Sequence, residues 1–238
     1  MRKVSAIFGA GPGLGAAMAR RFAAEGFRVA LVARRKDRLD ALVDELTAAG
    51  IDAAGFTADL NSPEEAPIVV DAIRERFGRI DVIEYGPVPN GGFTPAAKLD
   101  PATLAVGIPL LMLTPLAVVQ AVLPEWTERG DGAFLMTTGA GAVQPMPYAS
   151  GVVPLMAGAR NWLYSLNGEL AASGIYAGTL SIAAFIDGSE AAQTITAAAD
   201  PQAPVLPLVD PAELAEIYWD MYTKRDRVEE VHPDLPTS

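Results

Sequence analysis

The sequence predicts an α/β fold in which a mostly parallel β-sheet is covered by helices on both faces, within a single domain over residues 1–238. Short apolar runs alternate with amphipathic stretches of helical length along most of the chain. Strands that are separated by such helices pair in parallel and are buried on both faces. Half of the residues are apolar and a fifth are charged, which is a globular composition, and α/β domains commonly reach this size.

The elements of the first half follow from these runs in order. Residues 3–8 form a continuous apolar run that predicts a buried strand, and residues 15–25 carry apolar side chains at helical spacing. The same two patterns predict strands at residues 28–32, 53–57 and 80–83 and helices at residues 38–49 and 63–77.

A long apolar segment lies near the middle of the chain. Residues 105–124 are nearly long enough to span a bilayer. Pro109 and Pro115 would each remove helix hydrogen bonds, and acidic residues follow the segment. We therefore expect a buried or subunit-facing helix and no membrane partner.

The last third of the chain continues the pattern. Asp210 is expected to cap a final helix that has Pro211 in its first position and ends near Lys224. Before it, the pattern predicts strands at residues 132–137 and 176–182 and a helix at residues 150–172. Residues 184–209, which include the Pro- and Ala-rich stretch 194–207, are expected to form a substrate loop or lid, and residues 226–238 a loose tail.

The composition excludes several classes of function. The formal net charge of -11 argues against nucleic acid or an anionic membrane as a partner, because both need a cationic face. There is no cysteine, and His232 is the single histidine, so disulfides, thiolate chemistry, a metal site and a histidine-based triad are not expected. The N-terminus lacks the long apolar region of a signal peptide. We expect a cytoplasmic protein that acts on a small-molecule substrate.

A glycine-rich turn stands between the first strand and the first helix. Its sequence, FGAGPGLG over residues 8–15, permits a tight turn and a close backbone approach to a phosphate group. The helix that follows offers free N–H groups and the positive end of its dipole. The turn therefore predicts dinucleotide binding, although a purely structural turn is the alternative. The residues assigned to the dinucleotide are Gly9, Gly11, Gly13, Leu14 and Gly15.

The end of the second strand indicates which dinucleotide is bound. An NAD-binding chain is expected to hold the ribose 2'-hydroxyl with an acidic residue there. This sequence has Ala33, followed by Arg34 and Arg35, and two cations without a carboxylate suit a 2'-phosphate. We therefore expect NADP(H) as the cofactor, and the alternative is a solvated basic start of the next helix.

Several segments together resemble the short-chain dehydrogenase/reductase superfamily. The glycine spacing is similar to its TGxxxGxG turn, and ADL at residues 58–60 resembles its Asp-Leu pair beside the adenine. GRIDVIEYG, QAVLPEW and GAFLMTTG are similar to its fourth strand, its long interface helix and the strand before its active site. The resemblance covers residues 3–190 and implies a doubly wound Rossmann-type fold, a homodimer or homotetramer, and cofactor contacts from Asp59, Leu60, Gly86 and Ile186.

The resemblance is weaker where that family places its Ser-Tyr-Lys triad and a supporting asparagine. Thr138, or Thr137, stands where the serine is expected, and Tyr148 stands for the tyrosine. The lysine position is Val152, and the asparagine position is Leu111. These departures cluster at the nicotinamide and substrate end, whereas the phosphate end is intact.

The missing lysine affects the direction of the reaction. An unperturbed tyrosine has a pKa of about 10, so without a nearby cation it is a poor base at neutral pH, yet it can donate a proton as a phenol. Our hypothesis is an NADPH-dependent reduction of a carbonyl, enone or imine group in a small apolar substrate. The alternatives are a non-redox NADP(H)-binding sensor or partner-binding protein, and a non-redox enzyme such as a cyclase or dehydratase.

Other polar residues have both a structural and a functional interpretation. Glu84 or Tyr85 could be a rebuilt acid or base, or Glu84 could only satisfy backbone N–H groups. Arg160 is expected to form a structural ion pair. Asp187 and Glu190 fall in the substrate-loop region, and His232 lies close to the end of the chain.

Overall fold

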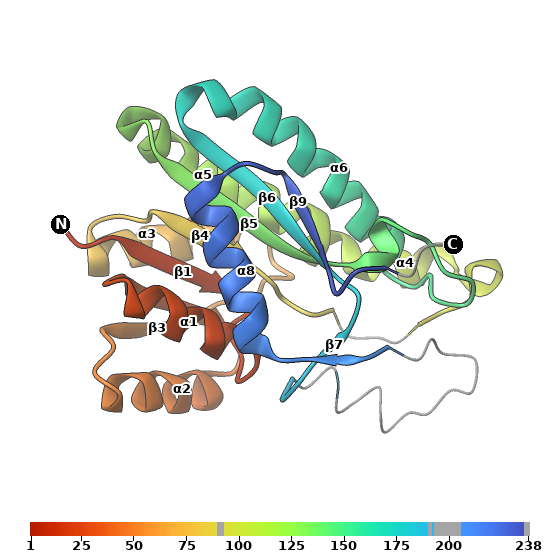
Figure 1. The fold of residues 1–238 in the computed structure, drawn as a ribbon, viewed down its shortest axis with the longest axis horizontal. Helices are drawn as coiled ribbons and strands as arrows, with labels where there is room; N and C mark the ends of the chain where they lie inside the picture. The colour runs from red at the N-terminus through yellow and green to blue at the C-terminus, as the bar shows by residue number, and fades with distance from the viewer. Residues whose placement is uncertain (90–92, 190–191, 193–205, 236–238) are drawn as a thin grey trace.

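Seven parallel strands form the central sheet of the computed structural model, which describes residues 1–89, 93–189, 192 and 206–235 (Figure 1). The strand order is β3-β2-β1-β4-β5-β6-β9, and each neighbouring pair is parallel. The predicted α/β fold is therefore confirmed. The strands are β1 (Val4–Phe8), β2 (Arg28–Ala33), β3 (Ala53–Thr57), β4 (Val82–Tyr85), β5 (Gly132–Gly139), β6 (Ile175–Ile182) and β9 (Glu229–His232).

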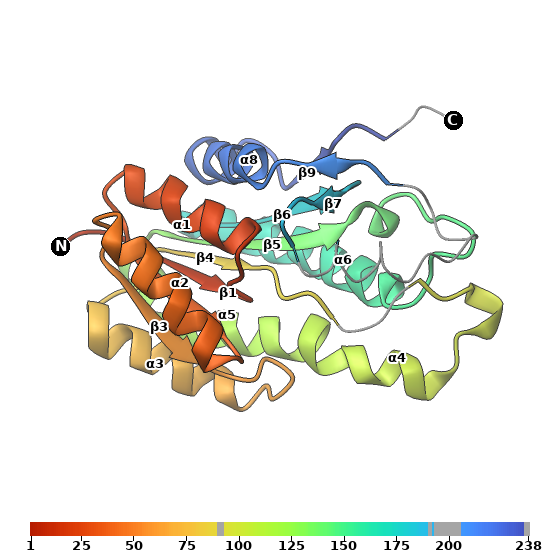
Figure 2. The same ribbon diagram turned by 90° about the horizontal axis from the view of Figure 1, so that it is seen from below.

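Helices cover both faces of the sheet, because the strands are apolar on both sides. One hydrophobic cluster joins the sheet to α1, α2 and α8, and a second joins it to α3, α5 and α6. Figure 2 shows α1 and α8 on one side of the sheet and α5 on the other. The bounds of these helices are α1 (Leu14–Ala24), α2 (Lys36–Ala48), α3 (Glu65–Phe77), α5 (Thr114–Arg129), α6 (Val153–Leu170) and α8 (Pro211–Lys224).

The long apolar segment near the middle of the chain remains helical through its prolines. It forms α4 (Pro101–Ile108), a π-helical turn at Pro109–Leu113, and α5. Pro109 opens the π turn and Pro115 lies in the first turn of α5, so the run stays helical although neither proline has an N–H group to donate. By length and composition alone the run Pro101–Arg129 could cross a membrane, with a mean hydropathy of 2.1, and 39% of its most apolar stretch is buried in the protein.

The end of the chain corrects the expectation of a loose tail over residues 226–238. Residues 229–232 form β9, which pairs in parallel with β6 from Thr179↔Glu229 to Ile182↔His232. Polar side chains made this segment look disordered, but they have specific partners in the fold. Residues 236–238 lie outside the described residues.

Part of the expected substrate loop at 184–209 is described. β7 (Phe185–Ile186) pairs in parallel with β8 (Leu208–Val209), and Asp210 caps α8 by accepting from Ala212 N at 2.8 Å, as predicted. Residues 190–191 and 193–205, which include Glu190 and most of the stretch 194–207, lie outside the described residues.

Candidate functional site

The glycine-rich turn connects β1 to α1, and its conformation requires glycine at two positions. Gly9 has φ +91°, and a Cβ atom there would lie 2.6 Å from the backbone of Pro87. A Cβ atom at Gly15 would lie 2.9 Å from Cα of Ala10. The N–H groups of Gly9 and Ala10 both donate to Val32 O, at 2.9 and 3.0 Å, so the turn is held against the end of β2.

The amino end of α1 has no side-chain cap, and the space beside Gly11 is open. No side chain caps α1 at Gly13, and no acidic residue lies in its first turn. A Cβ atom at Gly11 would have no neighbour within 4 Å. Leu14, by contrast, is buried and anchors the helix. Unpaired N–H groups and the positive dipole end favour an anion, so this turn fits the pyrophosphate of a dinucleotide.

The ends of β2 and β3 bring the predicted nucleoside contacts together. The register Ala33↔Thr57 aligns these two strand ends, and Arg34 and Arg35 follow with exposed side chains. Asp59 accepts hydrogen bonds from the backbone and side-chain amide of Asn61, which lower its pKa, and the charge of Arg34 lowers it further. Leu60 is buried, and its carbonyl accepts from Thr114 Oγ1.

Gly86 and Ile186 complete the group of predicted cofactor residues. The N–H of Gly86 donates to Phe8 O at 2.9 Å, which places Gly86 beside the glycine-rich turn. Ile186 lies on β7, next to Asp187, whose carbonyl oxygen would be 3.4 Å from a Cβ atom at Gly13. The structure therefore gathers the glycine-rich turn, Gly86 and the β7 segment at the carboxyl edge of the sheet, where open α/β sheets bind ligands.

The two candidate threonines of β5 point to opposite faces of the sheet. Thr138 is 2% exposed and hydrogen-bonds Thr179 Oγ1 at 3.1 Å and Ser181 Oγ at 2.8 Å. Thr137 hydrogen-bonds Glu84 Oε1 at 2.7 Å and the hydroxyl of Tyr218 at 2.6 Å. One substrate oxygen therefore cannot use both hydroxyls in this arrangement.

Tyr148 is not joined to either threonine. It lies in the loop before α6, has φ +65°, and is 53% exposed. Its hydroxyl makes no hydrogen bond with any residue that the structure describes. The helix begins at Val153, later than predicted, so Tyr148 is five residues ahead of it and free of the geometry that a first helical turn would impose.

The expected positions of the lysine and the asparagine both hold apolar side chains that lie near Gly107. Val152 Cγ1 and Leu111 Cδ1 lie 3.4 and 4.0 Å from the Cβ atom that Gly107 would carry. Leu155 lies beside them, 2.8 Å from the same point. A Cβ atom at Gly139, at the end of β5, would lie 3.6 Å from the sulfur of Met156. The first turn of α6 thus presents aliphatic and thioether groups to the end of the site.

Glu84 and Tyr85 are both buried, and they have different partners. Tyr85 donates to Leu110 O at 2.6 Å, and burial raises its pKa, so it is a structural residue. Glu84 is 2% exposed, and burial raises its pKa to about 8 although Thr137 donates to it. The sequence did not indicate that Tyr218 of α8 would join this group, because helical spacing predicts only that it is buried.

Arg160 forms the structural ion pair that was predicted, and its partner lies in the segment expected to be loose. Arg160 Nε lies 2.8 Å from Glu229 Oε1 on β9, which also accepts from Ser181 Oγ at 2.8 Å. The sequence offers one signal for this partner, since a cation such as Arg160 on a half-buried helix needs an acidic residue nearby. His232 pairs with Glu213 of α8, at 3.0 Å.

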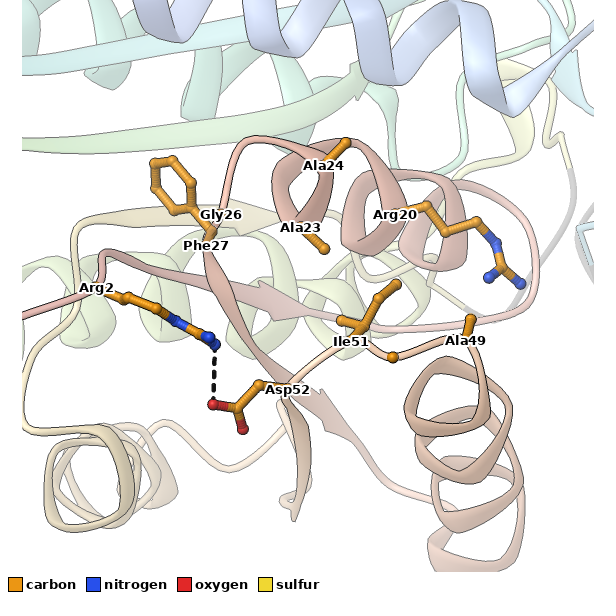
Figure 3. Close-up of a pocket in the computed structure, with 10 residues that line it drawn as sticks. Arg2, Arg20, Ala23, Ala24, Gly26, Phe27, Ala49, Ile51 and Asp52 are labelled. Atoms are coloured by element: carbon orange, nitrogen blue, oxygen red, sulfur yellow. Dashed lines mark hydrogen bonds and ion pairs between the residues drawn. The ribbon is translucent and has the colours of Figure 1, made fainter.

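A hollow at the opposite end of the sheet is remote from these groups (Figure 3). It lies where α1 and α2 end and where β2 and β3 begin, and Phe27 and Ile51 form part of its wall. Its two cations are paired, Arg2 with Asp52 at 3.0 Å and Arg20 with Glu45. The hollow therefore offers no free charge to a ligand.

Known proteins match the chain in sequence and in fold. A family model described as short chain dehydrogenase matches residues 3–190. A putative ketoacyl reductase of Streptomyces coelicolor is 31% identical over 73% of this chain and 67% of its own length. An A-factor type gamma-butyrolactone 1'-reductase (1S-forming) of Streptomyces virginiae is 42% identical over 41% of this chain and 38% of its own. The matched segments thus span between about two fifths and two thirds of these relatives.

A solved structure shows the same fold. A variant of actinorhodin polyketide ketoreductase with NADPH has a TM-score of 0.86, and the match covers 97% of this chain and 95% of that one. Its sequence identity is 24%, so the likeness concerns the fold alone.

Proposed function

Because the chain belongs to the short-chain dehydrogenase family, we propose that it is an NADP(H)-dependent oxidoreductase that reduces a carbonyl, enone or imine group of a small apolar substrate. The observation that carries this proposal is the glycine-rich turn with the uncapped amino end of α1. Gly9 and Gly15 leave no room for side chains, while Gly11 faces open space, as a backbone cradle for phosphate requires.

Arg34 and Arg35 support NADP(H) over NAD(H). Both side chains are exposed at the end of β2, and Ala33 supplies no carboxylate for a ribose hydroxyl. A guanidinium group binds a 2'-phosphate through charge-assisted hydrogen bonds. Asp59, held by Asn61, stands beside them and would meet the adenine end of the cofactor.

The substrate end supports reduction rather than alcohol oxidation. Bound NADPH would supply a hydride to the substrate. Tyr148 is the exposed phenol closest in sequence to the start of α6, and it would supply the proton as a neutral phenol. Val152, Leu155 and Met156 give this end of the site an apolar wall, which suits an apolar substrate.

Two measurements test this proposal. The purified protein is titrated with NADPH and NADH, and a panel of ketones, enones and imines is screened for loss of NADPH absorbance. We expect NADPH to bind far more tightly than NADH and at least one class of acceptor to be reduced. If a Tyr148→Phe variant turned over at the wild-type rate, the phenol would have no role in the reaction. If the wild type turned over none of these acceptors, the oxidoreductase assignment would be refuted.

A second candidate function rests on the apolar side chains of Leu111 and Val152. These residues pack against Gly107 where the related enzymes are expected to carry polar machinery, so the chain could bind NADP(H) as a sensor or partner-binding protein without redox chemistry. Tight NADPH binding together with a complete lack of turnover would favour this function.

We also propose that the protein is a homo-oligomer. Apolar side chains remain exposed along the long helical run and α6, including Val106 at 72% and Leu113 at 46%. Light scattering after size-exclusion chromatography should give the mass of a dimer or a tetramer, and a monomer mass at micromolar concentration would contradict the proposal.

A further inference from the structure

Glu84 is a carboxyl group buried in the centre of the sheet without an ion-pair partner among the described residues. The strand registers place it between Ile7 of β1 and Leu135 of β5, both of which are fully buried. Thr137 Oγ1 donates to Glu84 Oε1, and the Tyr218 hydroxyl lies 2.6 Å from the same threonine oxygen. Tyr218 of α8 is the titratable group that faces it, while β1, β5 and α1 contribute neutral side chains to this part of the core.

The carboxyl group lies beside the segment that contacts the first glycine of the glycine-rich turn. Its Oε1 atom would be 2.4 Å from a Cβ atom at Gly86, so it occupies the space that this glycine leaves. The segment from Gly86 to Pro87 in turn touches Gly9, whose Cβ atom would lie 2.6 Å from Pro87. A single layer of backbone therefore separates Glu84 from the glycine-rich turn.

Ionisation of Glu84 would change the charge under that turn. Burial raises the pKa of Glu84 to about 8, so the group is neutral at pH 7 and acquires its charge within one or two pH units above it. In a buried setting that charge is poorly screened, and it would repel an anionic ligand on the other side of the backbone layer.

We propose that Glu84 is a positioning residue whose proton is linked to the cofactor site, such that an anionic dinucleotide binds only while the Glu84 carboxyl is protonated. This inference rests on the proposed NADP(H) site. By reciprocity, dinucleotide binding holds the proton on Glu84, and loss of that proton expels the dinucleotide. Thr137 adjusts this balance, because its hydroxyl stabilises the ionised carboxylate.

The test measures the dissociation constant of NADPH from pH 6 to pH 9 by fluorescence, for the wild type and the Glu84→Gln variant. Glutamine keeps the size of the side chain and can still accept from Thr137, but it cannot ionise. We expect the ratio of the wild-type constant to the variant constant to rise about three- to tenfold between pH 7 and pH 9. Calorimetry at pH 8.5 in buffers of different ionisation enthalpy should show proton uptake on binding by the wild type alone.

A second variant keeps the test decisive if Glu84→Gln does not fold. Thr137→Val removes the hydrogen bond that stabilises the carboxylate, so it should move the midpoint of the pH effect upward. The inference would be overturned if the dissociation constant of NADPH changed with pH in the same way for wild type and Glu84→Gln, or if the midpoint did not move in Thr137→Val. Either result would leave the proposed cofactor site intact. If the wild type does not bind NADPH even at pH 6, the proposed cofactor site fails and the inference falls with it.

Discussion

Thr137 Oγ1 donates a hydrogen bond of 2.7 Å to Glu84 Oε1, which links the two adjacent central strands β5 and β4 through their side chains. The bond favours the ionised carboxylate, and burial favours the neutral acid. Burial is the larger effect, since it raises the pKa of Glu84 to about 8 from an ordinary value of 4.5. The Glu84 carboxyl group is therefore buried in its neutral form at pH 7.

This neutral acid should make the free energy of unfolding depend on pH. Between pH 4.5 and 8 the folded state keeps a proton on Glu84 that the unfolded state has released. The stability of the wild type relative to Glu84→Gln should therefore fall as pH rises through this window, by about 1.4 kcal/mol per pH unit. Urea denaturation of both proteins at pH 5, 6, 7 and 8 measures the difference. A constant difference across this range would show that Glu84 is already ionised in the folded protein.

The glycine-rich turn should tolerate a methyl group at one position and not at another. Gly9→Ala places a side chain at φ +91° and 2.6 Å from Pro87, so we expect a loss of about 2 kcal/mol or more and at least tenfold weaker NADPH binding. Gly11→Ala is the matched control for folding, because its Cβ atom would meet no protein atom within 4 Å. Thermal unfolding of both variants and NADPH titration of Gly9→Ala check this, and an equal loss of stability in the two variants would contradict the observed geometry.

Most of the fold was predictable because the central strands β1, β2, β4, β5 and β6 are largely buried on both faces. Continuous apolar runs such as residues 29–33 mark β2 without ambiguity, and the glycine-rich turn marks where β1 ends and α1 begins. The pattern failed at β9, where Glu229 and His232 make an edge strand look like a solvated tail. Their partners, Arg160 and Glu213, are distant in sequence, and local patterning cannot detect such pairs.

The candidate site also has one part that the sequence predicts and one part that it does not. The strand-turn-helix unit of the candidate cofactor end was predictable, since an apolar run, a glycine-rich turn and an amphipathic stretch follow one another in the sequence. The substrate end depends on side-chain direction, which sequence spacing does not determine when a loop precedes a helix. Tyr148 is exposed on such a loop. Thr137 and Thr138 are consecutive residues of β5, so their side chains point to opposite faces of the sheet. Glu84 was considered as an acid or base, but its burial could be seen only in the fold.

Arg34 and Arg35 should determine the preference between the two dinucleotides. Replacing both by alanine removes the cations at the end of β2 that would pair with a 2'-phosphate. We expect NADPH affinity to fall about 10- to 100-fold, corresponding to about 1.4 to 2.8 kcal/mol, with NADH affinity unchanged. Fluorescence titration with both dinucleotides measures this. An equal loss for NADH would indicate a general effect on the site rather than recognition of the phosphate.

The ion pair between Arg160 and Glu229 should be important for the stability of the edge of the sheet. Burial opposes ionisation of Glu229, but hydrogen bonds from Arg160, Ser181 and Tyr164 outweigh it and lower its pKa. The side chain of Glu229 is only 7% exposed, so Arg160→Met leaves a buried carboxylate short of its cation. We expect a loss of about 2 to 3 kcal/mol in urea denaturation at pH 7.

Two controls separate this effect from a generic loss of charge. Glu229→Gln added to Arg160→Met removes the orphaned charge and should recover part of the loss, because the two sites are coupled. Lys36→Met breaks the exposed pair with Asp40, whose side chains are 72% and 54% exposed, and should cost about 0.5 kcal/mol or less. Because the folded pKa of Glu229 is lowered, the contribution of the Arg160 pair should be complete above pH 4.5 and disappear as the pH falls further. Equal losses for Arg160→Met and Lys36→Met would mean that β9 is not held by this pair.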